Sequence, residues 1–380
     1  MKIAYLGIKG LPSKAGADRV VESLVERLKE HHEITVYCSR RHTSEAAEIE
    51  GMRLVRLPCL SGKHTAALSL FFLSAIHALV KGDYDLIHVH NAEACFVSPL
   101  LRIKYPVVST SHGPAYAREK WGRIAKFLIR LIDYFFIRFS NQLTSVSLPM
   151  AKEYEGRWKV SVHYLPNGVD HPVQLDPANA KETLLGYGID GDYLLFSAGR
   201  LDRTKGCHLL LKAFSGIETG LKLVIVGDEK TDPEYARELR KWTDPRIRFV
   251  PFISDKGTLF GIVQNAKLFV FPSAIEAMSM ALLEAASLGV PIVCSDIPAN
   301  QAVLPEGTIY FDSGDENDLE EKLRWALTHP EEMRERALKT QTFVRQNFSW
   351  DRIARQYDRL YQSMSGPRIL GVNPWITLGH

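Results

Sequence analysis

Two glutamates eight residues apart, Glu276 and Glu284, stand in the stretch of residues 267–296, which reads KLFVFPSAIEAMSMALLEAASLGVPIVCSD. A carboxylate can accept hydrogen bonds from two hydroxyls at once, so the pair suits sugar and ribose hydroxyls. The backbone N–H groups that open the expected helix can bind phosphate. They belong to Ala277, Met278, Ser279 and Met280. Taken alone, the two glutamates are better explained as a helix residue and a partner of the helix dipole.

A second candidate site lies in the sequence Gly199-Arg200-Leu201-Asp202-Arg203-Thr204-Lys205-Gly206. Arg200 and Lys205 flank a turn that follows a buried strand and precedes an expected helix at Cys207–Phe214. An arginine binds phosphate oxygens bidentately, a lysine supplies a point charge, and the helix start adds backbone N–H groups. The turn therefore predicts a diphosphate site more strongly than a solvated basic surface.

The first half of the chain carries weaker signals. A glycine-containing loop at Gly7–Ala17 is typical of phosphate or sugar binding and equally of a plain turn between strand and helix.

His112 closes a strand, where an imidazole suits cleft chemistry, although a lone histidine is often only packed. His88 and His90 point to one face of a strand. No third ligand is apparent at a telling spacing, so packed histidines are favoured over a metal pair.

Strand and helix patterns alternate along the whole chain. This alternation predicts an α/β fold with parallel sheets and helices on both faces. We expect two doubly wound, Rossmann-like domains that face each other across a cleft, with ligands at the carboxyl ends of the strands. The expected strands are Lys2–Gly7, Glu33–Ser39, Met52–Leu57, Asp85–His90, Pro106–Ser111, Gln142–Val146, Val160–Tyr164, Tyr193–Ala198, Lys222–Gly227, Arg246–Phe252, Lys267–Ser273, Pro291–Ser295 and Thr308–Phe311.

Turn-forming residues at Pro166–Asp170 mark the expected domain boundary. The first domain then spans residues 1–170 and the second spans residues 171–346. Two helices are expected near the C-terminus, and the second, at about residues 347–365, is expected to pack back on the first domain. Residues 367–380 show no periodicity and are expected to form a tail.

Composition places the chain among ordinary globular proteins. Its 380 residues suit two domains, and a net charge of +3 argues against a nucleic-acid partner. The chain opens directly on a strand and shows no signal peptide or membrane span. Five scattered cysteines, none in a C-x-x-C pair, favour a reducing compartment and hence the cytoplasm, and they give little support to a metal site.

A basic and strongly apolar helix is expected within Arg118–Phe139. Such a helix can lie in a membrane interface, on the inner face of the plasma membrane. It can equally be a buried helix with one wet stripe that includes Asp133, because periodicity alone does not separate the two. Both alternatives stay open.

Together these residues resemble retaining GT-B glycosyltransferases of family 4, the glycosyl transferases group 1 class. The resemblance covers most of the chain and is strongest at Glu276-x7-Glu284, at Gly199-Arg200-x4-Lys205-Gly206 and at Pro166–Asp170. The opening residues 9–17 also look like the branch that includes bacterial rhamnosyltransferases of capsule and exopolysaccharide assembly. That branch usually carries a second glycine and an aromatic residue where this chain has Ala17 and Asp18.

The resemblance implies a role for each matching residue. Arg200 and Lys205 would hold the donor diphosphate and stabilise the leaving nucleotide. Glu284 would bind the nucleotide ribose, and Glu276 would bind hydroxyls of the transferred sugar. His112 would lie beside the donor sugar near its anomeric carbon.

Gly16 would let the first loop approach the diphosphate or the acceptor. The family works without a divalent metal or other cofactor, and no covalent nucleophile is evident in this chain, in keeping with front-face attack.

The expected function is therefore sugar transfer from a nucleotide-diphosphate sugar to a glycan or lipid-linked acceptor, in cell-surface polysaccharide or glycoconjugate synthesis. One alternative is a nucleotide-sugar epimerase on the same fold, which would convert the donor without an acceptor. Another is a non-catalytic adaptor that binds nucleotide sugar or membrane. The full set of Arg200, Lys205, Glu276 and Glu284 argues against the adaptor, which would have no need of it.

Overall fold

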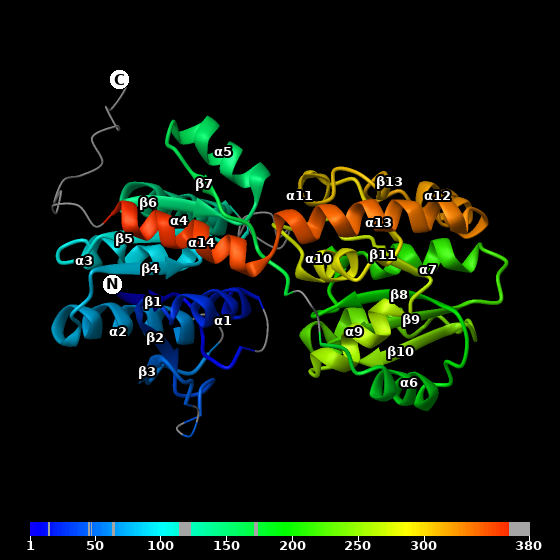
Figure 1. Ribbon diagram of the computed structural model, residues 1–380, viewed down its shortest axis with the longest axis horizontal. Helices are drawn as coiled ribbons and strands as arrows, with labels where there is room; N and C mark the ends of the chain where they lie inside the picture. The colour runs from blue at the N-terminus through cyan, green and yellow to red at the C-terminus, as the bar shows by residue number, and fades with distance from the viewer. Residues whose placement is uncertain are drawn as a thin grey trace. The chain divides into compact units, whose positions relative to one another are not determined.

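A computed structural model of the chain describes residues 1–13, 16–44, 46, 48–62, 65–113, 123–170 and 174–364, with backbone alone for residues 123–130. The chain divides into two compact units (Figure 1). Unit 1 comprises Met1–Asn167 and Trp350–His380, and unit 2 comprises Gly168–Ser349. The boundaries expected from the sequence lay at residues 170 and 346.

Unit 1 is built on a parallel sheet in the order β3-β2-β1-β4-β5-β6-β7. Its strands are β1 Lys2–Leu6, β2 Glu33–Ser39, β3 Met52–Leu57, β4 Leu86–His90, β5 Val107–Ser111, β6 Gln142–Ser145 and β7 His163–Tyr164. The central strands β4 and β5 are buried along their whole length. Strands of a parallel sheet that is covered on both faces are buried in this way. Here β4 and β5 also bury polar side chains, which include His88, His90 and Thr110.

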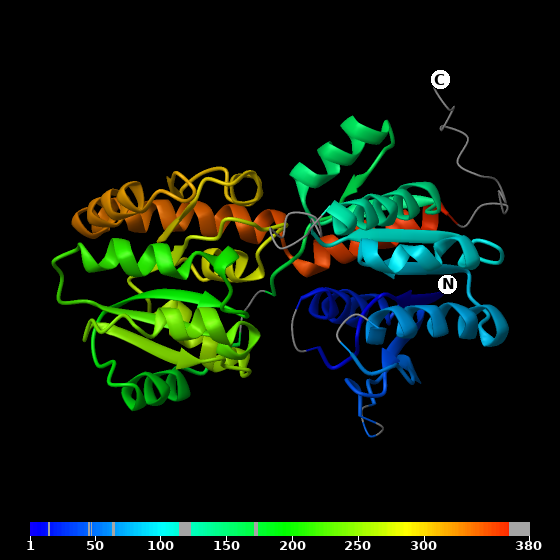
Figure 2. The ribbon, with the colours of Figure 1, turned by 180° about the vertical axis from the view of Figure 1, so that it is seen from behind.

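Helices cover both faces of this sheet (Figure 2). One face packs against α2, α4 and α5 in a continuous apolar core. On the other face, α1 packs against α14, which returns from the C-terminus. The helical segments are α1 Ala17–Leu28, α2 Thr65–Lys81, η1 Ala92–Val97, α3 Ser98–Leu101, α4 Arg123–Arg138, α5 Leu148–Trp158 and α14 Trp350–Ser363.

Unit 2 repeats the plan with a parallel sheet in the order β10-β9-β8-β11-β12-β13. Its strands are β8 Tyr193–Ala198, β9 Lys222–Gly227, β10 Ile247–Pro251, β11 Leu268–Phe271, β12 Ile292–Ser295 and β13 Ile309–Phe311. Helix α7 packs against α12, while α9 packs against α6 and α10 packs against α13. The helical segments are α6 Pro177–Gly186, η3 Arg203–Lys205, α7 Cys207–Ser215, η4 Glu229–Thr231, α8 Pro233–Leu239, α9 Lys256–Gln264, α10 Met280–Ser287, α11 Pro298–Val303, α12 Glu316–Thr328 and α13 Pro330–Asn347.

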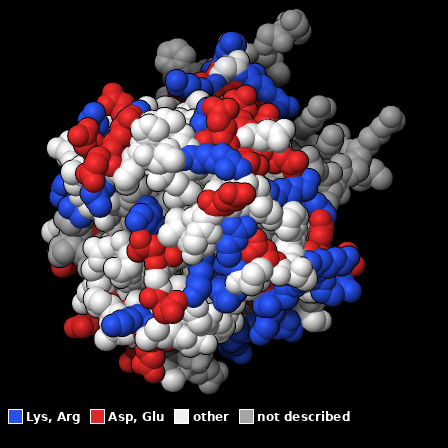
Figure 3. Space-filling model, turned by 90° about the vertical axis from the view of Figure 1, so that its right-hand side faces the viewer, with Lys and Arg blue, Asp and Glu red and all other residues white. Residues whose placement is uncertain are grey.

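Two parallel sheets with helices confirm the predicted α/β fold, and every strand predicted from the sequence is present. The largest differences are in β7, which covers only His163–Tyr164 of the five residues expected, and in β11, which covers four of the seven expected. Within the described residues, no helix combines the length and apolarity needed to cross a membrane. Charged side chains of both signs are interspersed on the face seen in Figure 3, in keeping with the small net charge.

Candidate functional site

The two strongest sequence motifs meet at one edge of the unit 2 sheet. Strands β8 and β11 are paired neighbours, and both run in the same direction, so their carboxyl ends lie side by side. The loop after β8 carries Arg200 and Lys205, and the loop after β11 carries Glu276. A backbone hydrogen bond from Ala274 N to Thr204 O, 2.8 Å long, ties the two loops together. The strand order reverses between β8 and β11, which is where doubly wound sheets bind their ligands.

Lys205 and Glu276 form an ion pair at this edge. The Lys205 Nζ lies 2.6 Å from the Glu276 Oε1, and the two side chains are only 15% and 10% exposed. The sequence had suggested separate roles for these residues, as a phosphate ligand and a sugar ligand. Their contact means that a bound diphosphate would compete with Glu276 for the lysine ammonium, and that Glu276 would then be released to accept hydroxyl hydrogen bonds.

Gly206 allows the two loops to approach each other. It has a φ of 70°, and a Cβ built on it would lie 2.0 Å from the Pro272 carbonyl oxygen. Only glycine tolerates both the left-handed backbone and this close contact. The same residue stands at the start of α7, so it also aims the first turn of that helix.

We therefore expect Gly206→Ala to lower the free energy of unfolding by at least about 2 kcal/mol, because both φ and the Pro272 contact become strained. Urea denaturation followed by circular dichroism would measure the change. Gly199→Ala is the matched control, since a Cβ there meets no atom within 4 Å. Equal stability of the two variants would contradict the close-packing explanation.

Arg200 is more accessible than Lys205. Its side chain is 48% exposed, and its Nη2 lies 3.7 Å from Asp202 Oδ2, a loose contact. Asp202 is itself engaged, because it accepts hydrogen bonds from the backbone N–H and the hydroxyl of Thr204. The Arg200 guanidinium is therefore exposed beside the turn, where it can bind an anion. Sequence reasoning missed the role of Asp202, although an acidic residue two positions before a threonine is a known turn signal.

Helix α10 begins later than predicted. It starts at Met280, with Ser279 as its N-cap accepting a hydrogen bond from Leu282 N. Ala277 and Met278 therefore lie in the preceding loop, and their N–H groups are not the first turn of the helix as expected. Glu276 lies in the same loop, between β11 and α10, whereas Glu284 lies in the helix itself.

Glu284 lies one turn into α10 and is only 8% exposed. A buried carboxylate is costly unless it is hydrogen-bonded, so this side chain is held in place rather than solvated. It is the one carboxylate among the buried side chains of α10. The role expected for Glu284, which is to bind the nucleotide ribose, stays a prediction.

In unit 1, side chains from α1 hold the first loop in place. Lys9 N donates to Asp18 Oδ1 at 3.2 Å, and Ser13 N donates to Glu22 Oε1 at 3.1 Å. Gly16 has a φ of 66° and stands directly before α1, where its carbonyl accepts hydrogen bonds from the first turn. Asp18, which departs from the related branch, therefore serves as the anchor of this loop. Part of the motif, Lys14 and Ala15, lies outside the described residues.

Three histidines form a cluster in unit 1. His88 and His90 lie on the same face of β4, as predicted, with ring centroids 4.0 Å apart. His112, at the end of β5, places its Nε2 2.8 Å from His90 Nδ1. Both ring nitrogens of His88 are already hydrogen-bonded, to Tyr361 at 2.7 Å and to Thr110 at 2.6 Å. In this histidine row, His88 packs against His90 and His90 is hydrogen-bonded to His112, in line with the packed alternative.

The row is electrically neutral near pH 7. Burial lowers the pKa of His112 to about 4, even though its ring keeps some exposed surface. Burial, followed by the neighbouring histidines, lowers the pKa of His90 well below its usual range. His88 follows the same trend, through burial and the proximity of His112. A ligand beside His112 would therefore meet a neutral imidazole, which can exchange hydrogen bonds but carries no charge.

Within the described part of the chain, no group of three or more His, Cys, Asp or Glu side chains is arranged to hold a metal ion. All five cysteines are free thiols, and four are buried.

Asp133 was expected on the polar stripe of the Arg118–Phe139 helix, but it is 3% exposed and accepts a hydrogen bond from Tyr154. Residues 118–122 and the side chains of 123–130 lie outside the described part of that helix. The prediction that Asp133 belongs to a wet stripe is wrong, because the residue faces α5.

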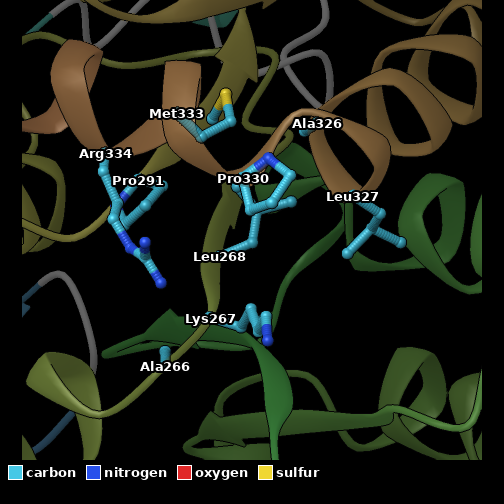
Figure 4. A pocket seen from close by; sticks show the side chains of 9 residues that line it. All are labelled: Ala266, Lys267, Leu268, Pro291, Ala326, Leu327, Pro330, Met333 and Arg334. Atoms are coloured by element: carbon cyan, nitrogen blue, oxygen red, sulfur yellow. The ribbon is translucent and has the colours of Figure 1, made fainter.

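A cavity of about 210 Å³ opens at the opposite edge of the unit 2 sheet, beside the amino ends of β11 and β12 (Figure 4). Its walls include Leu268, Pro291 and Met333, with Lys267 and Arg334 among the lining residues. None of the residues expected to bind the donor lines it. The cavity therefore takes no part in the proposed site.

Comparisons with known proteins agree with this architecture. The glycosyltransferase family 4 model matches residues 15–172, and the model described as glycosyl transferases group 1 matches residues 186–360. Phosphatidyl-myo-inositol mannosyltransferase of Mycobacterium leprae is 27% identical over 310 residues, which is 78% of this chain and 79% of that protein. The Escherichia coli UDP-Gal:alpha-D-GlcNAc-diphosphoundecaprenol alpha-1,3-galactosyltransferase is 25% identical over 324 residues, covering 80% and 81% of the two chains.

Among solved structures, Anabaena HepE in complex with UDP-glucose superposes with a TM-score of 0.77 over 96% of this chain and 100% of the other, at 18% identity. At 18% identity, this structural similarity is evidence only for a shared fold. The family models, by contrast, match both units of the chain. The chain therefore belongs to the family 4 glycosyltransferases of the GT-B fold and is an enzyme of sugar transfer.

Proposed function

We propose that this enzyme is a retaining, metal-independent glycosyltransferase that moves a sugar from a nucleotide-diphosphate sugar to a glycan or lipid-linked acceptor. It would act in the cytoplasm, at the inner face of the membrane, in cell-surface polysaccharide or glycoconjugate synthesis. Two relatives, the phosphatidyl-myo-inositol mannosyltransferase and the galactosyltransferase that acts on a GlcNAc-diphosphoundecaprenol, support a lipid-linked acceptor. A rhamnosyltransferase-like branch remains our expectation from the opening loop.

One observation carries the proposal: the Lys205–Glu276 ion pair, with Arg200 in the same loop as Lys205. Lys205 is partly buried, and a diphosphate, which supplies two charged groups, could replace Glu276 as the partner of its ammonium. Glu276 would then bind hydroxyls of the sugar that the diphosphate carries. Glu284, deeper in α10, would hold the ribose.

The reaction would run by front-face attack. The acceptor oxygen forms a bond to the anomeric carbon while the bond from that carbon to the diphosphate oxygen breaks, and the electron pair leaves with the diphosphate. The acceptor proton passes to the same departing oxygen. Lys205 and Arg200 stabilise the negative charge that develops on the leaving group. His112 beside the anomeric carbon, and Gly16 near the diphosphate or acceptor, stay predictions from the family.

A thermal-shift panel with UDP, GDP, ADP and dTDP and their sugar esters, in EDTA, tests the donor site. A ligand at about 100 times its dissociation constant should add about 2.7 kcal/mol of stability. We expect a shift with one nucleotide family that is lost in Lys205→Ala. Lys212→Ala is the control, because its ion pair with Glu316 is exposed and lies on α7, away from the loop.

Product analysis distinguishes this function from the alternatives. Transfer with retained anomeric configuration, followed by NMR of the product, is the expected outcome. Conversion of the donor sugar without any acceptor would favour an epimerase. Loss of all activity in EDTA that is restored by a divalent cation would contradict metal independence.

A further inference from the structure

Helix α2 is apolar on both of its faces. It runs for 17 residues with the sequence TAALSLFFLSAIHALVK. Its inner face packs into the unit 1 core through Leu70, Phe71 and Ala75. A helix that covers a soluble domain normally turns polar side chains outward, whereas one that is apolar all round is usually buried or in contact with a membrane.

The outer face of α2 is exposed. Leu68, Phe72, Ile76 and Val80 follow each other at four-residue intervals, with exposed fractions of 51%, 47%, 38% and 70%. Leu73, 38% exposed, lies beside them. Four-residue spacing puts these side chains on one side of the helix. Contiguous exposed apolar side chains of this kind mark interaction sites. We call these five residues the α2 surface.

Basic side chains border the α2 surface. Lys81 ends the helix, and Lys104 reaches its last turn, where Nζ donates to Leu79 O at 3.3 Å and to Gly82 O at 2.8 Å. Ile103, 72% exposed, precedes Lys104. Arg53 lies on β3, which packs against α2. Burial lowers the pKa of His77 on α2, and the charges of Arg53 and Lys81 lower it further.

Carboxylates are absent from this part of the sequence. Residues 52–81 contain no Asp or Glu, and neither do residues 98–113. Asp83, just beyond α2, pairs with Lys2 at 2.7 Å. An apolar stripe bordered by cations is complementary to a surface that offers acyl chains beneath negative headgroups.

We propose that the α2 surface docks unit 1 onto a bilayer that contains anionic phospholipid. The five apolar side chains enter the boundary between headgroups and acyl chains, with the helix axis lying in the membrane plane. Lys81, Lys104 and Arg53 contact phosphate groups around it. The proposal does not rest on the proposed reaction, because docking needs neither donor nor acceptor. It also differs from the Arg118–Phe139 prediction, which concerns another helix.

Vesicle flotation of the full chain tests the proposal. One vesicle contains phosphatidylcholine with about one third phosphatidylglycerol, and the other contains phosphatidylcholine alone. We expect binding to the anionic vesicle that weakens with added salt. Leu68→Ser/Phe72→Ser should reduce its partition coefficient about ten-fold or more, since two large apolar side chains no longer leave water.

The matched control is Leu185→Ser/Leu338→Ser, which removes two leucines of unit 2 that are 51% and 61% exposed. It should bind as wild type does, and thermal melting should show both variants folded. Equal binding by both double variants would overturn the proposal. So would a wild-type dimer in light scattering that Leu68→Ser/Phe72→Ser dissociates, with no vesicle binding, because the α2 surface would then belong to a second copy.

Discussion

Lys205→Ala is expected to lower kcat for sugar transfer by about 100- to 1,000-fold. A preorganised group that meets charge developing in the transition state contributes about this much. Steady-state assays at saturating donor would measure the change. A wild-type rate in this variant would show that Lys205 does not hold the diphosphate.

The ion pair with Glu276 complicates this substitution. Without Lys205, the Glu276 carboxylate stays 10% exposed and lacks its 2.6 Å partner, which we expect to cost up to about 3 kcal/mol of stability. The double variant Lys205→Ala/Glu276→Gln removes the unpaired charge and should recover most of that stability. It should remain inactive. Recovery of activity together with stability would mean that the loss in the single variant was structural.

Acidification is expected to destabilise unit 1 through its histidine row. The pKa values of His88, His90 and His112 are lowered in the fold, while an unfolded chain binds these protons near pH 6.5. The unfolded state thus holds more protons below that pH, and the free energy of unfolding falls as pH falls. With a folded pKa of about 4, His112 alone accounts for about 3 kcal/mol between pH 6.5 and pH 4.

Buried carboxyls act in the opposite sense. Burial raises the pKa of Asp133 to about 6, so this group binds a proton in the fold before it does in the unfolded chain. Urea denaturation at several pH values between about 7 and about 5 would give the slope. Asp133→Asn should steepen it, and His112→Gln should flatten it by about 1.4 kcal/mol per pH unit. An unchanged slope in His112→Gln would show that this histidine is not held neutral.

The strands were readable from the sequence because a buried parallel strand needs a short apolar run between turn signals. Element ends were less readable. Helix α10 starts at Met280 because Ser279 caps it, while the sequence pattern alone suggested an earlier start. That difference of two residues leaves the N–H groups of Ala277 and Met278 in the loop before the helix. The contact of Glu276 with Lys205 was not predicted at all, because the two residues lie in different loops.

The α2 surface shows that sequence periodicity did not predict which helix face would be exposed. A run of leucines and phenylalanines predicts burial, and one face of α2 is indeed buried. Periodicity does not reveal that the opposite face remains exposed, because both faces carry the same kinds of residue. For Asp133 the sequence predicted exposure and the structure shows burial. Its spacing with basic residues suggested a solvent-exposed stripe, but its side chain accepts a hydrogen bond from Tyr154.

By itself, the sequence determined the class of fold, the strands, the glycine turns and the residue types able to bind a nucleotide sugar. These depend on local properties: apolar runs, residues that permit a left-handed backbone, and charges placed after a strand. Only the tertiary structure decided which of them meet. Lys205 and Glu276 are 71 residues apart, His90 and His112 are 22 apart, and His88 and Tyr361 are 273 apart. These contacts follow from strand order, which the burial of both sheet faces selects and no local pattern encodes. They also depend on the return of α14 to unit 1, which was expected for about residues 347–365 but without the side chains that it would meet.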